Sequence, residues 1–369
     1  MRAVRQHRFG GPDVLTLEEV ADLAPGPGTV RIDVAAAGVH LLDTTIRSGA
    51  GGGPFSPPVL PMTPGREVAG RVDALGEGVD VRWLGRPVVA HLGAASGGYA
   101  EQAVAPVEAL IERREDTDPS AAVAMVGTGR TALAILEEAA VTKSDVVVIT
   151  GAAGGLGTLL VQATRAAGAF VVGLAGGQAK LALVQSLGAD AAVDYRVEGW
   201  PERVVSELAG RRVSLLLDGV GGDTARAAFE LVRPGGRVVL FGYTSGTPLP
   251  LDAGDLFAHG VSVTAAIGPR LLSRPGGIHA FAVRAVGELE AGRLVPVVHP
   301  PFPLADAAGA HRALTGRATV GKVVLAVDDA AVSDAAVSDA AAEAPGGASN
   351  DAAAEAPGGA GVPDPVIPL

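Results

Sequence analysis

Cysteine is absent from all 369 residues of the sequence. Its absence excludes disulfide bonds, iron–sulfur clusters, zinc sites with thiolate ligands and cysteine nucleophiles. The sequence also lacks any run of 18 uncharged apolar residues, and its first residues, Met1 to Val4, do not lead into the apolar segment of a signal peptide. Together with a hydrophobic content of 48%, these absences indicate a soluble globular protein, which we expect in the cytoplasm.

Basic residues are absent from Asp328 onward, where eight of the 40 acidic residues lie. The rest of the chain has 32 acidic and 29 basic residues and is nearly neutral, so no basic surface is expected for nucleic acid or an anionic membrane. The final segment repeats AAVSD and AAAEAPGGA twice each. Because such a composition cannot bury a core, we interpret residues 328–369 as a disordered tail, with an interaction segment as the alternative.

The other residues predict an α/β protein with two domains. Residues 1–122 contain short strand-like runs separated by Gly and Pro, which indicates a β-rich domain. In residues 123–266 strands alternate with helices, an order typical of a doubly wound parallel sheet. Residues 267–327 are expected to return to the first domain, because five or six strands already complete a nucleotide-binding sheet. The expected strands are 30–34, 67–72, 88–90, 99–104, 146–149, 170–175, 191–194, 214–217 and 237–241, and the expected helices include 179–187 and 278–291.

The segment VVVITGAAGGLGTLL, residues 146–160, combines a buried strand, a glycine turn and the start of a helix. The turn contains Gly151, Gly154, Gly155 and Gly157. Glycine permits a tight turn and a close approach of the backbone to a pyrophosphate, and the N-terminus of the helix offers free N–H groups to the anion. This pattern predicts a dinucleotide site, and the alternative is a tight connection without a ligand.

An acidic residue is missing from the end of the second strand expected in this domain, 170–175. Proteins that bind NAD place Asp or Glu there, about 20 residues after the glycines, to hold the ribose hydroxyls. Here glycines follow the strand, Lys180 lies shortly beyond, and Tyr195 and Arg196 follow the third strand. Cationic side chains near a strand end that lacks Asp or Glu favour binding of the 2′-phosphate of NADPH. In the alternative interpretation Lys180 and Arg196 are ordinary solvated charges.

In their order and spacing, several motifs resemble the medium-chain dehydrogenase/reductase superfamily, specifically its zinc-independent, zeta-crystallin-like quinone oxidoreductase branch. The resemblance spans residues 1–327 and rests on AGV (37–39), Asp43, IRSG (46–49), PGREVAG (64–70), GYAE (98–101), the glycine turn, LGAD (187–190), FG (241–242), SG (245–246) and RATVGK (317–322). It implies a GroES-like catalytic domain built from both ends of the chain, a Rossmann domain inserted between them, and a homodimer. It also implies hydride transfer from NADPH to a quinone, an electron-poor carbonyl or an activated alkene.

The same resemblance implies roles along the cofactor. It places the pyrophosphate on Gly154 and Gly155 and the 2′-phosphate on Lys180 and Tyr195. It places the nicotinamide half against four further residues, Thr128, Phe241, Ser245 and Arg317. Phe241 would also be compatible with a role as a core strand residue.

Catalytic zinc is not expected. Zinc-dependent relatives carry a cysteine and a histidine where this chain has His40 and Arg66, and a guanidinium cannot ligate a cation. An unusual metal site made of four side chains is the remaining alternative: His40, Asp43, Glu67 and His91. Without a Lewis acid, catalysis depends on positioning and on donors that stabilise the developing oxyanion.

His40 is the candidate catalytic residue, because related reductases often carry an asparagine at this place beside the nicotinamide. It could donate a hydrogen bond to the acceptor oxygen or deliver a proton, and the alternative is a histidine satisfied within a turn. We expect Asp43 and Arg47 to form a structural pair, and Glu67 to anchor Arg66 or a backbone amide.

The loop of residues 49–53 lacks the tyrosines that quinone reductases and enoyl reductases carry nearby. This departure leaves the acceptor open. A reductase of quinones or related conjugated carbonyls is the leading hypothesis. The alternatives are a reductase of enoyl or alkenal double bonds and a non-catalytic NADPH-binding protein.

Overall fold

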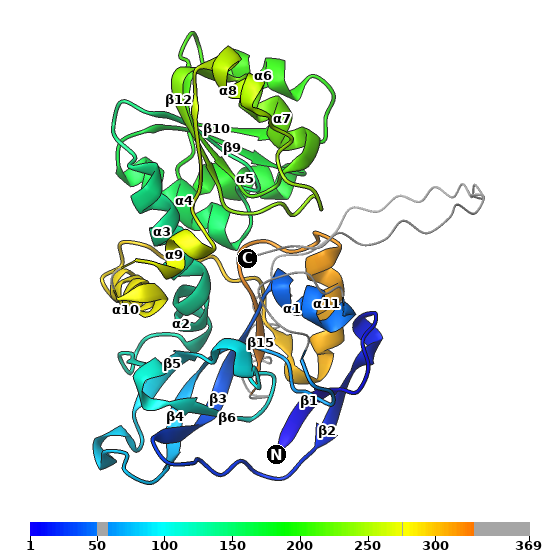
Figure 1. The fold of residues 1–369 in the computed structure, drawn as a ribbon, viewed down its shortest axis with the longest axis vertical. Coiled ribbons are helices and arrows are strands. Elements are labelled where there is room, and N and C mark those ends of the chain that lie inside the picture. The colour runs from blue at the N-terminus through cyan, green and yellow to red at the C-terminus, as the bar shows by residue number, and fades with distance from the viewer. Residues whose placement is uncertain (50–57, 275, 328–369) are drawn as a thin grey trace, which may run out of the picture.

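The computed structural model describes residues 1–49, 58–274 and 276–327. These residues form two lobes, each built around its own β-sheet (Figure 1). The expectations for the tail, 328–369, and for most of the loop of residues 49–53 concern residues outside these ranges.

The cofactor lobe contains a six-stranded sheet in the order β10-β9-β8-β11-β12-β13, with every neighbouring pair parallel. This is the strand order 3-2-1-4-5-6 of a doubly wound dinucleotide-binding sheet, which confirms the predicted fold class. The strands are β8 (Val146–Ile149), β9 (Phe170–Ala175), β10 (Ala191–Asp194), β11 (Val213–Asp218), β12 (Val232–Leu240) and β13 (Ser262–Ala265). The first three have the predicted bounds, whereas β13 was not among the expected strands.

Helices cover both faces of this sheet because its strands are apolar on both sides. Along β8, Val147 and Ile149 belong to one core and Val146 and Val148 to the other. The first core includes residues of α3, α4, α5 and α10, and the second includes residues of α6 and α7. The helices are α3 (Arg130–Ala139), α4 (Gly155–Ala166), α5 (Gln178–Ser186), α6 (Trp200–Glu207), α7 (Gly222–Glu230), α8 (Ala253–His259), α9 (Pro269–Leu272) and α10 (Gly277–Glu290).

The catalytic lobe contains a seven-stranded sheet in the order β14-β15-β3-β4-β5-β7, with β6 paired to β3. β15 pairs antiparallel with β3, so the C-terminal part of the described chain lies in the same sheet as the N-terminal part. The strands are β3 (Thr29–Val39), β4 (Glu67–Leu75), β5 (Pro87–His91), β6 (Gln102–Pro106), β7 (Leu110–Glu112), β14 (Phe302–Pro303) and β15 (Val323–Ala326). Beside the sheet lie α1 (Leu41–Ser48) and α11 (Ala307–Thr315) (Figure 1).

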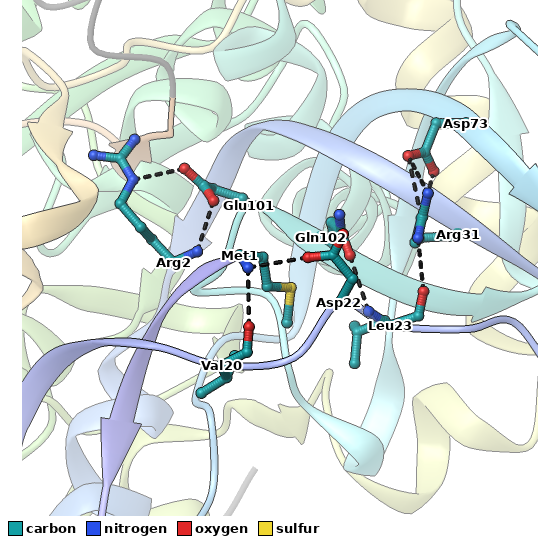
Figure 2. A network of polar contacts seen from close by, with 9 residues as sticks. All are labelled: Met1, Arg2, Val20, Asp22, Leu23, Arg31, Asp73, Glu101 and Gln102. Carbon is teal, nitrogen blue, oxygen red and sulfur yellow. Dashed lines mark hydrogen bonds and ion pairs between the residues drawn. The ribbon is translucent and has the colours of Figure 1, made fainter.

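A hydrogen-bond network fastens the first strand, β1 (Arg2–Gln6), which pairs with β2 (Leu15–Glu19). The ammonium group of Met1 donates to the carbonyl of Val20 at 2.9 Å and contacts Asp22 at 3.0 Å. The Glu101 carboxylate accepts from both the backbone N–H and the Nε of Arg2, each at 2.6 Å (Figure 2). The N-terminal strand is therefore held against the segment that leads into β6.

One continuous helical stretch connects the lobes. It consists of α2 (Pro119–Ala124), a π-helical turn (Met125–Gly129) and α3, and the side chain of Asp118 caps it by accepting from the N–H of Ala121 at 2.7 Å. Within the described residues, this stretch is long and apolar enough to cross a membrane. Since 61% of its most apolar window is buried inside the fold, it has the burial of a core helix.

Candidate active site

The glycine turn lies between β8 and the N-terminus of α4. Gly151 has a φ of +61°, which side chains rarely allow, and Gly154 is the N-cap of α4. A Cβ atom on Gly157 would overlap the carbonyl oxygen of Gly151 and the backbone of Ala152. These glycines therefore allow α4 to begin directly against the turn, with its free N–H groups facing outward.

A cavity of about 350 Å³ extends from this turn into the catalytic lobe. Its walls include ten of the eleven residues predicted from the sequence: His40, Thr128, Gly151, Gly154, Gly155, Gly157, Lys180, Tyr195, Phe241 and Arg317. The structure does not place Ser245 in the wall. Its hydroxyl instead donates to the carbonyl of Thr247 at 3.1 Å, and Thr244 lines the cavity nearby.

Lys180 and Arg317 line this cavity, and a third cation, Arg196, lies close enough to act on Lys180. The Lys180 ammonium donates to the carbonyl of Arg317 at 2.6 Å, and the guanidinium of Arg196 lies against Gly176 and Gly177, which follow β9. Burial, with added repulsion from Arg196 and Arg317, lowers the pKa of Lys180. An anionic group bound here would relieve that repulsion, so this end of the cavity suits a phosphate.

A carboxylate that sequence reasoning overlooked lies next to these cations. Asp194 ends β10, contacts Arg196 Nη2 at 2.9 Å and accepts from the backbone N–H of Gly177 at 2.8 Å. Hydrogen bonding from Arg196 holds the pKa of Asp194 well below its usual range. Both oxygens of Asp194 are thus engaged in orienting Arg196 and the glycine turn after β9.

A buried acid fixes the part of the cavity wall formed by Gly219 and Val220. Asp218, which is fully buried at the end of β11, accepts from the hydroxyl of Thr150 at 2.6 Å and from the backbone N–H of Val220 at 3.1 Å. Burial raises the pKa of Asp218. These bonds fix the turn at Gly219, where the absence of a Cβ lets the ring of Phe241 pack against the backbone.

On the catalytic-lobe side, His40, Glu67 and Lys322 form a chain of contacts. His40 Nε2 lies 2.5 Å from Glu67 Oε1, and Lys322 Nζ donates to Glu67 Oε2 at 2.8 Å. Glu67 is 0% exposed and Lys322 4%, while His40 and Lys322 both line the cavity. Burial alone would raise the pKa of Glu67, but the charges of His40 and Lys322 hold it well below its usual range. The structure thus gives Glu67 two partners that were not expected from the sequence, His40 and Lys322.

The expected pair between Asp43 and Arg47 is wrong. Asp43 stands in the first turn of α1, where Oδ2 accepts from the backbone N–H of His40 at 2.8 Å and from the hydroxyl of Tyr99 at 3.1 Å. Arg47 instead donates to a backbone carbonyl and contacts His311 Nδ1 at 3.0 Å. Asp43 therefore caps the start of its own helix, and Arg47, one turn later, contacts α11.

The π-helical turn accommodates Glu67. A Cβ on Gly127 would overlap Glu67 Oε1, so glycine at this position leaves room for the carboxylate. The next residue, Thr128, lines the cavity. Single π-turns inserted into α-helices are frequent at functional sites, and here the insertion meets both Glu67 and the cavity.

The four side chains weighed as an unusual metal site are not arranged to hold a metal ion. Within the described ranges no three His, Cys, Asp or Glu side chains are grouped to hold a metal ion. Glu67 accepts a hydrogen bond from the ammonium of Lys322, and His91 Nδ1 accepts from the backbone N–H of Gly93 at 3.1 Å. Burial lowers the pKa of His91 to about 3.

Comparison with known proteins identifies this architecture. Residues 26–115 match the model of the alcohol dehydrogenase GroES-like domain, and residues 155–281 match the model of zinc-binding dehydrogenases. A quinone oxidoreductase of Sus scrofa is 33% identical over 314 residues, which cover 84% of this chain and 93% of that protein. The chain belongs to the medium-chain dehydrogenase/reductase superfamily. As a member of this superfamily, the protein is an oxidoreductase.

Other members of the superfamily resemble the chain over a similar length. A 2-haloacrylate reductase of a Burkholderia species is 31% identical, with 85% of this chain and 95% of that protein covered. The structure of Escherichia coli quinone oxidoreductase complexed with NADPH has a TM-score of 0.79 and 27% identity, and covers 89% of this chain and all of that one. These relatives support the GroES-like and Rossmann-type organisation predicted from the sequence.

Sequence reasoning missed Asp218 and Lys322 in this superfamily member. Lys322 stands directly before β15, in a stretch that is otherwise apolar. A lysine bordering a buried strand needs a partner for its charge, and that requirement was the available signal. Asp218 could have been recognised in a similar way. It is an acid at the carboxyl end of an apolar strand, and cofactors bind at the carboxyl ends of the strands in such sheets.

Proposed function

We propose that this protein is an NADPH-dependent reductase that transfers hydride to a quinone or a related conjugated carbonyl. One observation carries the proposal: a single cavity joins the glycine turn and two cations, Lys180 and Arg317, to the imidazole of His40. The quinone oxidoreductases among the relatives, one of them complexed with NADPH, support it.

The residues of the cavity fit NADPH. Gly154 and Gly155 would hold the pyrophosphate at the N-terminus of α4, and Lys180 and Tyr195 would hold the 2′-phosphate. Thr128 and Phe241 would border the nicotinamide half. When bound, NADPH supplies the hydride. His40 then gives a proton to the acceptor oxygen, where negative charge develops.

Removal of one cation tests the cofactor assignment. In Lys180→Ala, the KM for NADPH should rise about tenfold or more, because a charge-assisted contact with the 2′-phosphate is lost. The KM for NADH, which lacks this phosphate, should change little. Steady-state kinetics with both cofactors give the ratio.

Lys143→Ala is the matched control, since Lys143 is exposed and does not line the cavity. It should leave the KM for both cofactors unchanged. Equal losses with NADPH and NADH in Lys180→Ala, or a wild-type preference for NADH, would contradict the assignment.

A second candidate acceptor is an activated carbon–carbon double bond. The similarity to a 2-haloacrylate reductase favours it, and a proton from His40 would serve this reaction as well. A panel of quinones, 2-alkenals and enoyl thioesters, followed by NADPH oxidation at 340 nm, separates the two. Tight NADPH binding without turnover on any acceptor would instead indicate a binding protein.

We further propose that the reaction needs no zinc. Arg66 cannot ligate a cation, and the ammonium of Lys322 already neutralises Glu67. Protein treated with a chelator and shown to be free of metal should retain full activity. A loss of activity that zinc restores would contradict this.

We also propose a homodimer that acts in the cytoplasm. β13 is an edge strand of the six-stranded sheet as described, and Phe257 on the neighbouring α8 is 89% exposed. An exposed edge and a large apolar side chain suit pairing with a second copy. Light scattering on the eluting protein should give twice the mass of the chain, and cell fractionation should recover it without membranes.

A further inference from the structure

Glu67 lies in a place where a carboxylate is costly. Its side chain is 0% exposed, and burial of an ion is strongly unfavourable unless a partner of opposite charge is present. Lys322, itself only 4% exposed, supplies that partner at 2.8 Å on Oε2. The second oxygen, Oε1, is left for His40 Nε2 at 2.5 Å. The carboxylate therefore bridges the ammonium group of Lys322 and a ring that can gain or lose a proton.

Other titratable and charged groups lie around this bridge. They are Asp43 of α1, Arg66, His91 of β5 and Arg130 of α3, and Arg66 lies 3.7 Å from Asp43. Asp43 is engaged with Tyr99 and the backbone, and burial keeps His91 neutral, with a pKa of about 3. Glu67 is the acid that contacts the ring directly, at 2.5 Å.

We infer that Glu67 is a positioning residue that holds the His40 imidazole in its proton-donating form, and that Lys322 limits this effect. The arrangement has the logic of a carboxylate–histidine dyad, in which the acid fixes the ring and stabilises the imidazolium without taking the proton itself. Its catalytic role rests on the function proposed above. The electrostatic coupling of the three side chains can be measured without any substrate.

The proton balance of the reaction follows from this geometry. Hydride, with the electron pair of the C–H bond that would break as NADPH becomes NADP⁺, would form a C–H bond at the β-carbon of a conjugated carbonyl. The π pair of the double bond would move onto oxygen as an enolate. The His40 ring, which lines the cavity, gives up its proton, and this proton neutralises the enolate. The side chain is 28% exposed, so water in the cavity can return the proton to the ring.

Two substitutions of opposite charge effect provide the test: one removes the negative charge of Glu67, and the other removes the positive charge of Lys322. Glu67→Gln removes the negative charge, so the imidazole should lose its proton at a pH lower by about one unit or more. Lys322→Met removes the competing positive charge and should move the same transition to higher pH. The ring resonances of His40 are followed by NMR against pH in the full chain without cofactor, and they are identified by their loss in His40→Gln.

A matched control and a second variant keep the result interpretable. Glu112→Gln removes the same charge from an exposed position in β7 of the same sheet and should leave the transition in place. If either single variant fails to fold, Glu67→Gln/Lys322→Met leaves no buried charge unpaired, and its transition should still fall below that of the wild type. Shifts in the same direction in both single variants, or a transition unchanged in Glu67→Gln, would overturn the inference.

The pH profile of turnover connects the coupling to catalysis. The pH at which kcat falls on the alkaline side should move down in Glu67→Gln and up in Lys322→Met. A uniform loss of kcat with an unmoved profile would overturn the catalytic role and leave a structural pair. If the NMR transitions shift as expected but no acceptor is reduced by the wild type, the proposed function fails while the coupling stands.

Discussion

The two walls of the cavity are built by different means. On the cofactor side, backbone groups form the binding surface, and the four glycines of the turn lie within the seven residues from Gly151 to Gly157. On the catalytic side, charged side chains from separate strands meet, and Glu67 and Lys322 are 255 residues apart in the chain. The first wall depends on the absence of side chains, and the second on the mutual satisfaction of charges. A substitution in the cofactor wall should therefore weaken NADPH binding alone. A substitution in the catalytic wall should disturb all of its paired charges and lower both stability and turnover.

The largest effect is expected where the catalytic wall is tightest. In Gly127→Ala, the new methyl group would occupy the position of Glu67 Oε1 and push the carboxylate away from His40 and Lys322. Disruption of a buried ion pair costs about 3–5 kcal/mol, so the melting temperature should fall strongly. Turnover should fall as well, because His40 loses its partner. Thermal melts and kcat measurements check both.

A smaller and more local effect is expected on the cofactor wall. In Gly157→Ala, the methyl group would overlap the backbone of the turn, so α4 must shift away from the pyrophosphate. NADPH binding should weaken about 10- to 100-fold, which corresponds to roughly 1.4–2.8 kcal/mol. Fluorescence titration of NADPH measures this change. The same titration on Gly127→Ala should show a smaller loss.

Gly287→Ala is the control for both substitutions. A Cβ on Gly287, inside α10, would meet nothing within 4 Å, so alanine should stabilise the helix by up to about 1 kcal/mol. It should leave NADPH binding and turnover unchanged. The contrast between the two walls is wrong if Gly157→Ala lowers kcat and leaves NADPH affinity unchanged. It is also wrong if Gly127→Ala lowers NADPH affinity and leaves kcat unchanged.

The mildest prediction concerns acid. Burial lowers the pKa of His311 to about 4, whereas a histidine in an unfolded chain titrates near 6.5. Between these values the unfolded chain binds the proton and the folded chain does not, so stability is lost as pH falls. From pH 7 to pH 5 the loss from this residue should be about 2 kcal/mol. His91, with a pKa of about 3, adds a loss in the same direction.

Urea unfolding at both pH values measures this dependence in the wild type and in His311→Gln. The variant should show a smaller loss between pH 7 and pH 5. His7→Gln, at an exposed position, should retain the whole dependence. An undiminished loss in His311→Gln would show that the ring is already protonated in the folded protein at pH 5.

The contrast between the walls also explains what could be predicted from the sequence. The bounds of β8, β9 and β10 and the position of the glycine turn follow from local periodicity and glycine spacing, which are visible in a short window. The contacts of Glu67 and Arg47 do not, because each partner comes from a distant segment. Asp43 and Arg47 were expected to pair with each other, but Asp43 instead caps the start of α1. Ser245 lies one position away from the cavity wall, an error of register within a turn.

The helical stretch from Pro119 to Ala139 limits how this protein can be recombined. A chimera that exchanges the cofactor-binding lobe for that of a relative needs junctions, and the natural choice is the connection between the lobes. Here that connection carries Gly127 against Glu67 and Thr128 on the cavity wall. A junction within the stretch would combine a helix selected for one carboxylate with a strand that presents another. The helix and the Glu67 strand therefore have to be inherited together.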